Sequence, residues 1–516
     1  MKDLTSSVYT FEDLIQGNFL YVDKTEYIWQ LIRPAKEMYF LSRPRRFGKS
    51  LTLSTLKAVF QGKKDLFKGL AIYDKPYDWK PYPIIHLDMN GFDFSTVEAV
   101  NSSLSRLMRE TAEIHHVTLV ESKPDQMFRE IITELSKKQA VVILLDEYDK
   151  PILNNIGKPE CKQILAILKS FYSVIKAFEG KLRFAFITGV SKFCHVSLFS
   201  DLNNLTDITM DARYATMLGY TQAEFETNFK EQIEAVEKKQ DLSHTDFLSE
   251  IKNWYDGFRF EENSESVYNP VSLANFFEKG GKFNNYWFET GTPKFLVDLS
   301  KSQDFDFEST MNEPVPGIAF SAFEIDNIDP LTLLLQTGYV TIKGTEKKLG
   351  ETWYHLDFPN REVAGSFNTY LLNRYSGKTQ TDVVKFTAEL TSALNAGDVK
   401  RLRKAMEVFF AGISYEVHHK NESNFQNIFF AIFRLLGIRI KAEENTNDGR
   451  IDAVAETEKY VFIFEFKLDN DDTALSQIKE KKYYKQYELF GKKIFLNGVT
   501  FSTENGQIID WQTEEV

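Results

Sequence analysis

The chain has 516 residues, of which 43% are hydrophobic and 26% are charged, and its formal net charge is −12. A single hydrophobic core rarely extends beyond about 300 residues, so two to four domains are expected. The negative charge argues against a protein coated for non-specific nucleic-acid binding, although a local basic groove is compatible with it.

The cysteine content indicates a reducing compartment. Cys161 and Cys194 give neither a disulfide framework nor a metal-binding pattern. We therefore expect a cytoplasmic protein. The first residues lack the apolar stretch of a signal peptide. No run approaches the roughly 20 apolar residues that span a bilayer, so no membrane partner is expected.

Residues 1–36 are predicted to form a helical lead-in, and residues 39–50 then have the layout of a phosphate-binding loop. An apolar strand and a tight turn lead to Gly48-Lys49-Ser50, which opens a helix. Backbone N–H groups there would face the phosphates, Lys49 would reach the β- and γ-phosphates, and the Ser50 hydroxyl would hold Mg²⁺. The pattern G-x-x-x-x-G-K-[ST] asks for glycine where this chain has Arg43, so the motif depends on its strand–turn–helix context. The predicted nucleotide-contacting residues of this segment are Arg45, Arg46, Phe47, Gly48, Lys49, Ser50 and Leu51.

A second strand, residues 140–145, is continuously apolar and ends in Asp146 and Glu147. Such runs form buried parallel strands with ligand sites at their carboxyl ends. Asp146 would bind Mg²⁺, directly or through water, and Glu147 would be the catalytic residue that polarises the attacking water. A core strand followed by an acidic loop is the alternative. The phosphate loop about a hundred residues earlier favours the nucleotide site.

A third apolar strand, residues 182–191, ends in hydroxyl groups. Thr188 is the candidate for sensing the γ-phosphate, with Ser191 second, and a plain strand end is the alternative for each. Together the strands predict a P-loop domain over residues 37–215.

A helical lid and a winged-helix-like region are predicted over residues 216–400. A helix beginning near Leu331 is followed by two strands with a turn rich in Lys and Gly between them. Such regions can bind DNA, but we favour packing on the nucleotide domain, because a fold alone does not give a function.

Residues 401–516 contain a second chemical pattern. Asp452 precedes a short strand, and Glu465 and Lys467 lie in the apolar strand 460–467. Alternation along a strand places Glu465 and Lys467 on one face. Two carboxylates, Asp452 and Glu465, would hold Mg²⁺ for phosphodiester hydrolysis, and Lys467 would orient water or stabilise charge. Glu422, at a helix start, either complements the helix dipole or is an outer metal ligand.

The alternative is a hairpin in which Glu465 and Lys467 form a surface pair. The apolar flanks on both sides of Glu465 favour partial burial, where a charge needs a purpose or a partner. A helix is predicted to follow over residues 474–487. Its lysines and those just beyond could contact a nucleic-acid backbone or form a solvated face; they are Lys479, Lys481, Lys482, Lys485, Lys492 and Lys493.

On these residues the chain resembles bacterial AAA-ATPase-like proteins that carry a C-terminal PD-(D/E)XK nuclease-superfamily domain. The resemblance covers nearly the whole chain, and an arginine stands at the position of Arg43 in that family. It implies ATP-site roles for Lys49, Ser50, Asp146 and Glu147. It implies nuclease-core roles for Asp452, Glu465 and Lys467, with Glu422 and Gln477 in support. The family often has Tyr-His after the motif glutamate, where this chain has Phe425-Gln426, which puts a role for that histidine in doubt. The strings that carry the resemblance are residues 21–25, 42–50, 145–150, 268–270, 449–452, 465–467, 477–478 and 483.

The predicted fold class is α/β multidomain, with a parallel P-loop NTPase sheet, the helical and winged-helix-like middle region, and a restriction-endonuclease-like α/β domain. The predicted function is an ATPase coupled to a Mg²⁺-dependent nuclease, with ATP and Mg²⁺ as cofactors. Nucleic acid is the expected partner, with DNA favoured over RNA. One alternative is an ATP-dependent switch whose C-terminal domain binds nucleic acid without cutting, and another is an interaction protein with both sites vestigial. An oligomer is left open, because ring-forming ATPases need an arginine finger in trans and Arg213 is available.

Overall fold

The computed structural model describes residues 2–192, 205–240, 242–287, 305, 307–320, 329–413, 422–437, 444–446, 449–451, 453–469, 473–502, 504 and 507–516. Two compact units divide the chain: residues 1–287, 316–345 and 350–352 form the first, and the remaining residues form the second. The four segments predicted from the sequence are a finer division and stay a prediction. Among the described helices, none has the length and apolar character needed to cross a lipid bilayer.

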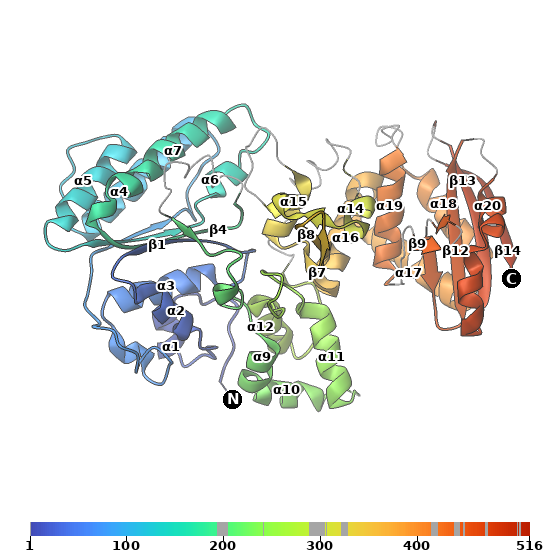
Figure 1. The fold of residues 1–516 in the computed structure, drawn as a ribbon, viewed down its shortest axis with the longest axis horizontal. Coiled ribbons are helices and arrows are strands. Elements are labelled where there is room, and N and C mark those ends of the chain that lie inside the picture. Colours follow the sequence, from blue (N-terminus) through green and yellow to red (C-terminus); the bar gives the residue numbers. More distant parts are fainter. Residues whose placement is uncertain are drawn as a thin grey trace. The chain divides into compact units, whose positions relative to one another are not determined.

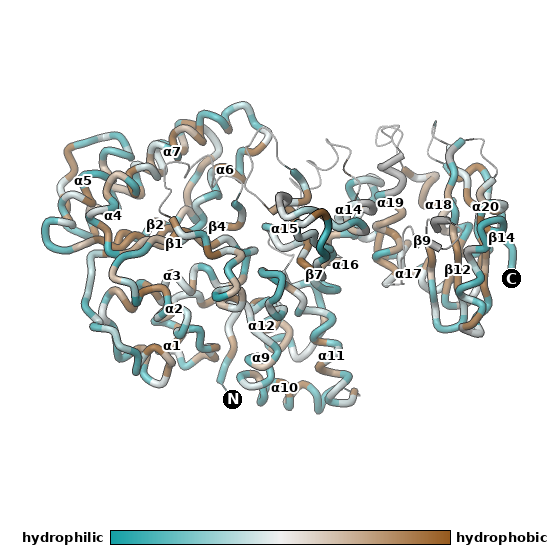
Figure 2. The backbone as a smooth tube through the Cα atoms, in the orientation of Figure 1, coloured by the Kyte–Doolittle hydropathy of each residue, from teal (hydrophilic) through white to brown (hydrophobic). Residues whose placement is uncertain are grey.

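The centre of the first unit is a five-stranded sheet with strand order β2-β3-β4-β1-β5, in which all neighbours run parallel. Helices cover both faces (Figure 1): α4, α5 and α7 lie on one side, and α1, α2 and α3 on the other. Strands buried on both faces must be continuously apolar, and in Figure 2 they carry the brown of hydrophobic residues. The strands are β1 (Glu37–Ser42), β2 (Ile84–Asp88), β3 (Val141–Asp146), β4 (Leu182–Gly189) and β5 (Thr206–Asp207).

The covering helices are amphipathic and follow the strands in the order that a parallel sheet requires. Short helical turns, η1 (Lys64–Phe67), η2 (Glu179–Lys181) and η3 (Ala212–Tyr214), lie in the connections. The helices are α1 (Phe11–Gln16), α2 (Thr25–Ile32), α3 (Lys49–Phe60), α4 (Val97–Ile114), α5 (Pro124–Ser136), α6 (Lys150–Leu153) and α7 (Cys161–Ala177).

Register brings the chemically important strand ends to one edge of this sheet. Ser42 of β1 lies opposite Gly189 of β4, and Asp88 of β2 lies opposite Asp146 of β3. Because the strands are parallel, all of these residues lie at the carboxyl edge, where ligands bind in open α/β sheets.

A group of short helices follows the sheet and is held together by aromatic side chains. The first of them begins with the predicted capping box, in which the Thr221 hydroxyl accepts from the Glu224 N–H and the Glu224 carboxylate accepts from the Thr221 N–H. Phe225 and Phe276 are fully buried in the shared core. The helices are α9 (Gln222–Asn228), α10 (Lys230–Glu237), α11 (His244–Tyr255) and α12 (Pro270–Glu278).

The predicted helix and hairpin near residue 331 are present. Helix α15 (Pro330–Thr337) leads into β7 (Thr341–Lys348) and β8 (Glu351–Asp357), and the three-stranded sheet has the order β6-β8-β7. The two turn residues, Leu349 and Gly350, have φ values of 54° and 83°, as two-residue hairpins require. The chain passes from the first unit to the second within this hairpin. The remaining short elements are β6 (Val315–Pro316), η5 (Gly317–Phe320) and α14 (Phe307–Asn312).

The second unit contains a mixed sheet, so the predicted α/β class holds in both units. Its strand order is β11-β12-β13-β14, with β12 and β13 parallel and the outer pairs antiparallel. One face of β12 packs against helix α19, where the rings of Phe466 and Phe429 are 4.1 Å apart. The other face carries Val461 and Ile463, which pack against Ile478 of α20. The elements are α16 (Arg361–Ser376), α17 (Gln380–Ala396), α18 (Val399–Ala411), α19 (Glu422–Leu435), β9 (Glu444–Thr446), β10 (Gly449–Ile451), β11 (Ala453–Glu456), β12 (Tyr460–Leu468), α20 (Ala474–Glu480), η7 (Tyr483–Phe490), β13 (Lys493–Phe501) and β14 (Ile508–Glu515).

The continuous helix predicted over residues 474–487 is wrong. The α-helix ends at Glu480, Lys482 takes a left-handed backbone with φ of 53°, and a 3₁₀ helix follows. A 3₁₀ helix aligns side chains three positions apart. That spacing directs Tyr484 and Tyr487 into the core beside β12 and β13, so burial of the two rings outweighs the helical periodicity.

Candidate functional site

The loop between β1 and α3 leaves its backbone open to a ligand. Gly48, just before α3, has a left-handed φ of 95°, and a Cβ there would meet no atom within 4 Å. Arg46 also has a positive φ, 64°. The first turn of α3 contains no acidic residue and Gly48 provides no side-chain cap. The free N–H groups and the positive end of the helix dipole are therefore available to an anion.

Lys49 lies folded across its own loop. Its ammonium group donates to the backbone oxygens of Arg43 at 3.0 Å and Pro44 at 2.9 Å, and its side chain is buried. Burial lowers the pKa of Lys49, while the negative charges of Asp146 and Glu147 act in the opposite direction. A lysine held this way can exchange two carbonyl acceptors for phosphate oxygens with little movement.

Ser50 and Asp146 meet at the carboxyl edge of the sheet. The Ser50 hydroxyl donates to Asp146 Oδ2 at 2.5 Å. Asp146 is 2% exposed, and burial raises its pKa to about 6. Mg²⁺ is commonly held by one or two protein oxygens together with phosphate oxygens, and this pair could supply the protein oxygens. Within the described part of the chain no three His, Cys, Asp or Glu side chains are grouped to hold a metal ion by themselves.

Glu147 has an uncommon backbone conformation for a non-glycine residue, with φ of 52°. Its N–H donates to the Asp146 carboxylate at 3.0 Å, and its own carboxylate lies 3.7 Å from the Lys150 ammonium group. The Glu147 side chain remains 25% exposed. Such backbone strain costs on the order of 1 kcal/mol or more and concentrates at functional sites. The conformation leaves the Glu147 carboxylate partly exposed, directly after Asp146 in the chain.

The two hydroxyl candidates at the end of β4 differ in their contacts. Thr188 is fully buried, and its Oγ1 makes no hydrogen bond to any described residue. The Ser191 hydroxyl donates to Asp149 Oδ2 at 2.7 Å. Thr188 is therefore the one of the two whose hydroxyl has no hydrogen-bond partner among the described residues.

Arg43 has a structural role in place of the glycine of the motif. Its guanidinium group donates to the backbone oxygens of Ser42 at 2.9 Å, Thr209 at 2.6 Å and Tyr214 at 3.3 Å, and lies 4.2 Å from the ring centroid of Phe260. Arg43 is 1% exposed, and burial lowers its pKa to about 9. The side chain thus remains charged at neutral pH and ties the loop to distant segments.

Other side chains predicted to contact the nucleotide are used to hold the loop. Phe47 is buried, with its ring 4.8 Å from that of Phe258. The Arg46 guanidinium group donates to the Tyr286 backbone oxygen at 2.8 Å. Phe47 could therefore bind a phosphate only through its backbone N–H group, because its side chain is packed against Phe258. Arg45 is exposed and Leu51 half-buried.

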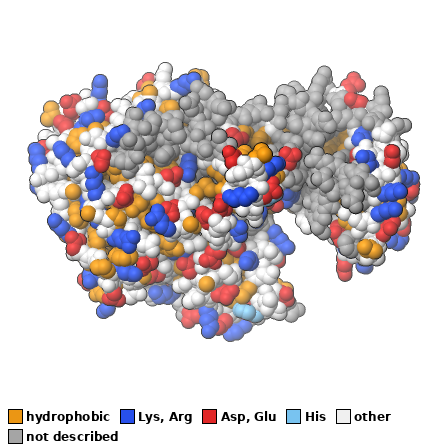
Figure 3. Space-filling model, viewed as in Figure 1, with side chains coloured by type: hydrophobic (Ala, Val, Ile, Leu, Met, Phe, Trp, Pro, Cys, Tyr) orange, Lys and Arg blue, Asp and Glu red, His pale blue; other side chains and the backbone are white. Residues whose placement is uncertain are grey.

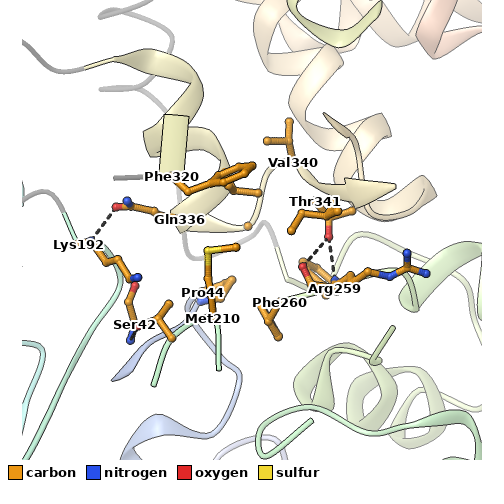
Figure 4. Close-up of a pocket in the computed structure, with 15 residues that line it drawn as sticks. Ser42, Pro44, Lys192, Met210, Arg259, Phe260, Phe320, Gln336, Val340 and Thr341 are labelled. Atoms are coloured by element: carbon orange, nitrogen blue, oxygen red, sulfur yellow. Dashed lines mark hydrogen bonds between the residues drawn. The ribbon is translucent and has the colours of Figure 1, made fainter. Parts of the chain in front are cut away.

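A cavity of about 50 Å³ lies beside the loop (Figure 4). The Lys192 N–H donates to Gln336 Oε1 of α15 at 2.7 Å across one side of it. Gly338, directly after α15, lies so close to Pro44 that a Cβ there would meet the proline ring at 2.5 Å. Helix α15 therefore touches both the phosphate loop and the segment after β4. The cavity is lined by Ser42, Pro44, Lys192, Thr209, Met210, Phe258, Arg259, Phe260, Phe320, Leu335, Gln336, Gly338, Val340, Thr341 and Ile342.

The second candidate site surrounds Glu465 of β12, which is 2% exposed. Gln477 of α20 donates from Nε2 to Glu465 Oε1, and the Lys467 ammonium group lies 3.4 Å from the same oxygen. Gly498 of β13 is paired in register with Glu465, and a Cβ there would meet the Leu475 nitrogen at 2.5 Å. This glycine lets α20 approach the sheet closely enough for Gln477 to reach the acid.

The structure thus brings together Glu465, Lys467 and Gln477. Of the remaining predicted ligands, Asp452 lies outside the described residues, and of Glu422, the first residue of α19, only the backbone is described.

The predicted basic patch is partly neutralised by neighbouring acids. On the face drawn in Figure 3, basic and acidic side chains are interspersed over the first unit as well. The acids leave less positive charge than the lysine count indicates for attracting a nucleic-acid backbone. Three of the six lysines form ion pairs: Lys479 with Glu514, Lys492 with Glu456, and Lys493 with Glu515.

Sequence reasoning missed one acid of the first site, Asp149. It is fully buried and accepts hydrogen bonds from the N–H groups of Val190 at 3.1 Å and Ser191 at 2.8 Å. A signal was present, because a second aspartate follows Asp146 within a few residues of a buried strand, where an acid needs a partner.

The family model described as a predicted AAA-ATPase matches residues 6–199, and the model of the PD-(D/E)XK nuclease superfamily matches residues 420–511. An uncharacterized protein in the vnfD 5′ region of Azotobacter chroococcum mcd 1 is 35% identical over 528 residues, which cover 100% of this chain and 99% of that protein. Among solved structures, the Aeropyrum pernix ORC2 protein (ADPNP-ADP complexes) matches 81% of this chain and 85% of its own, with 10% identity and a TM-score of 0.30. At that score the likeness carries no argument.

Proposed function

The chain belongs to the predicted AAA-ATPases that carry a C-terminal domain of the PD-(D/E)XK nuclease superfamily, and we propose that it binds and hydrolyses ATP to control a metal-dependent nuclease in the cytoplasm. The observation that carries the ATPase half is the 2.5 Å contact between Ser50 and Asp146 at the start of α3. It joins a hydroxyl and a carboxylate suited to Mg²⁺ beside a helix N-terminus suited to phosphates.

Each residue of the first site has a distinct role in this proposal. The N–H groups at the start of α3 and the Lys49 ammonium group bind the phosphates, and Ser50 and Asp146 hold Mg²⁺. When bound there, the ion would neutralise charge that develops on the phosphates. Glu147 orients the attacking water, and the Thr188 hydroxyl contacts the γ-phosphate.

The second site is proposed to cut nucleic acid, with DNA favoured over RNA. Glu465 and Asp452 would hold Mg²⁺, which polarises the scissile phosphate. Gln477 fixes the Glu465 carboxylate from α20, and Lys467 stabilises charge or orients water. The Gln477 amide and the Lys467 ammonium group both contact one oxygen of the buried Glu465. These contacts fix the orientation of the carboxylate, which a metal ligand requires.

Contacts of α15 support coupling between ATP and the nuclease. Lys192, which follows the γ-phosphate-sensing strand, is hydrogen-bonded to Gln336, and Pro44 of the phosphate loop lies against Gly338. β7 follows directly, and the chain passes into the second unit within it. A shift of either nucleotide loop would therefore act on the segment that leads to the nuclease domain.

One observation favours a second function, an ATP-dependent switch that binds nucleic acid without cutting. The Glu465 carboxylate already has the Lys467 ammonium group at 3.4 Å and the Gln477 amide as partners, so its charge is compensated without an ion.

The test compares ATP turnover and nucleic-acid cleavage in the parent, Glu147→Gln and Glu465→Ala, with Mg²⁺ or Mn²⁺ and with or without ATP. We expect Glu147→Gln to bind ATP but lose turnover, and Glu465→Ala to keep turnover but lose cleavage. ATP binding without cleavage of any DNA or RNA by the parent would favour the switch. No ATP binding by the parent would refute the ATPase half.

A further inference from the structure

A buried set of contacts joins the segment after β3 to the end of β4. Asp149 is fully buried, and its Oδ2 accepts from the Val190 N–H at 3.1 Å, the Ser191 N–H at 2.8 Å and the Ser191 hydroxyl at 2.7 Å. Its Oδ1 also accepts from the Val190 N–H, at 3.2 Å. We call Asp149, Val190 and Ser191 the clasp. These donors lie immediately after Thr188 and Gly189.

Tyr148 closes the same junction from the other side. Its N–H donates to the Thr188 backbone oxygen at 3.1 Å, and its hydroxyl donates to the Ser191 backbone oxygen at 2.8 Å. The Tyr172 hydroxyl in turn donates to the Tyr148 backbone oxygen at 3.0 Å. Both strand ends are therefore fixed to each other through backbone and side-chain bonds.

Gly189 makes this close approach feasible. A Cβ at Gly189 would meet the Tyr148 ring at 2.5 Å and Asp149 Oδ1 at 2.6 Å. Both distances are far below van der Waals contact, so a larger residue would force the two segments apart.

The clasp is built on a buried acid, where an apolar residue would cost less to bury. Burial raises the pKa of Asp149, and the hydrogen bonds from Ser191 and Val190 oppose that effect. A buried carboxylate is costly even when hydrogen-bonded, and apolar packing would hold two segments together at lower cost. The carboxylate fixes the direction of the hydrogen bonds from Val190 and Ser191. It thereby fixes the position of Thr188, which lies just before these two residues, relative to Asp146 and Glu147.

We propose that Asp149 is a positioning residue for ATP hydrolysis, which holds the end of β4 so that the Thr188 hydroxyl meets the γ-phosphate. This inference rests on the proposed ATPase function. Asp149 touches neither nucleotide nor metal; it acts through Thr188, and it joins the loop that bears Glu147 and the strand that bears Thr188 into one rigid piece.

The test uses the full chain and measures turnover, KM for ATP, and the ratio of ADP to ATP dissociation constants. We expect Asp149→Asn, which keeps the size but presents an amide to N–H donors, to lower kcat by about tenfold or more, since a misplacement of ~1 Å can cost up to about 100-fold. The preference for ATP over ADP should fall with it, because that preference depends on contact with the γ-phosphate, while ADP affinity stays within about twofold.

Two further variants separate positioning from folding. Ser191→Ala removes one donor and should move kcat and the ATP preference in the same direction by a smaller factor, and Ser191→Thr, which keeps a hydroxyl, should restore both. If Asp149→Asn does not fold, this pair decides the question. Thr111→Val is the matched control, because the Thr111 hydroxyl is buried in α4 and donates only to its own helix, to the Leu107 oxygen at 2.8 Å.

The outcomes distinguish the inference from the function on which it rests. A parent chain that neither binds nor hydrolyses ATP overturns the proposed function. An active parent whose Asp149→Asn variant melts at a lower temperature but keeps its kcat per folded molecule and its ATP preference overturns the positioning role alone.

Discussion

The phosphate loop and the Glu465 site differ in what holds them in shape. In the loop, the groups proposed to bind phosphate are backbone N–H groups and the Lys49 ammonium group, and the side chains of Arg43, Arg46 and Phe47 point away to anchor the loop. At Glu465, the chemical groups are side chains, and the backbone contributes only the close approach at Gly498. Such a loop should tolerate exchange of the motif side chains that neither bind the ligand nor anchor the loop, whereas a side-chain site should tolerate no exchange of its chemical groups.

The largest effect is expected at Lys49, the loop side chain proposed to bind phosphate directly. Lys49→Met should weaken ATP binding by roughly 1000-fold, because two charge-assisted hydrogen bonds of ~2 kcal/mol each are lost. Isothermal titration with ATP and Mg²⁺ measures this. Lys137→Met, an exposed lysine paired with Glu134, is the control and should bind ATP like the parent.

Next in size is the replacement of Arg43 by the glycine that the loop motif asks for. Arg43→Gly should lower stability by about 3 kcal/mol, since three carbonyl oxygens, two of them in buried contacts, lose their donor and the contact with Phe260 is lost. Thermal unfolding and ATP titration check it. A variant as stable as the parent that binds ATP more tightly would show that the side chain does not anchor the loop.

A smaller effect is expected from pH at Asp146. Its folded pKa of about 6 lies above its ordinary value of 3.8, so a proton competes with Mg²⁺ below pH 6. Affinity for Mg²⁺-ATP should fall by about tenfold per pH unit there. The folded chain binds this proton more tightly than the unfolded chain. Protonation of Asp146 therefore stabilises the fold at low pH, and this contribution to the free energy of unfolding is lost as the pH rises through about 6. Titrations from pH 7 to 5 with a melting curve at each pH check this, and Asp146→Asn should bind weakly without the pH dependence.

The smallest predicted effect sharpens the side-chain half of the comparison. Gln477→Ala should reduce cleavage by about tenfold or less, because the Glu465 carboxylate loses one orientating hydrogen bond worth ~1.5 kcal/mol but keeps Lys467. Cleavage rates at several Mg²⁺ concentrations measure it, with Ser476→Ala, on an exposed neighbour, as the control. Unchanged rates at every concentration would mean that Gln477 does not orient the acid.

The strands and their chemical ends could be predicted from the sequence because their signals are local. Continuous apolar runs gave β1, β3 and β4, and alternation along β12 placed Glu465 and Lys467 on the same side, where their side-chain atoms lie 3.4 Å apart. The predicted roles of these residues stay predictions.

The anchors could not be predicted, because their partners are remote in sequence. Arg43 donates hydrogen bonds to the backbone of Thr209 and Tyr214 and stacks on Phe260. No local sequence pattern predicts such contacts. Asp149 was visible as an acid, but its donors at Val190 and Ser191 follow another strand. The end of the α-helix before Lys482 likewise depends on the burial of Tyr487 in the core beside β12 and β13.

The anchoring of the phosphate loop also determines how far the chain could be shortened. A fragment ending at residue 215 would retain every motif residue of the nucleotide site, yet it would lack Phe258, Phe260, Tyr286 and Gly338, which contact the loop. The smallest piece that keeps the loop in the conformation it has in the whole chain must therefore extend past α15. For the same reason, a protease cut between residues 215 and 258 would loosen the phosphate loop, although the residues between 215 and 258 contribute no ligand to it.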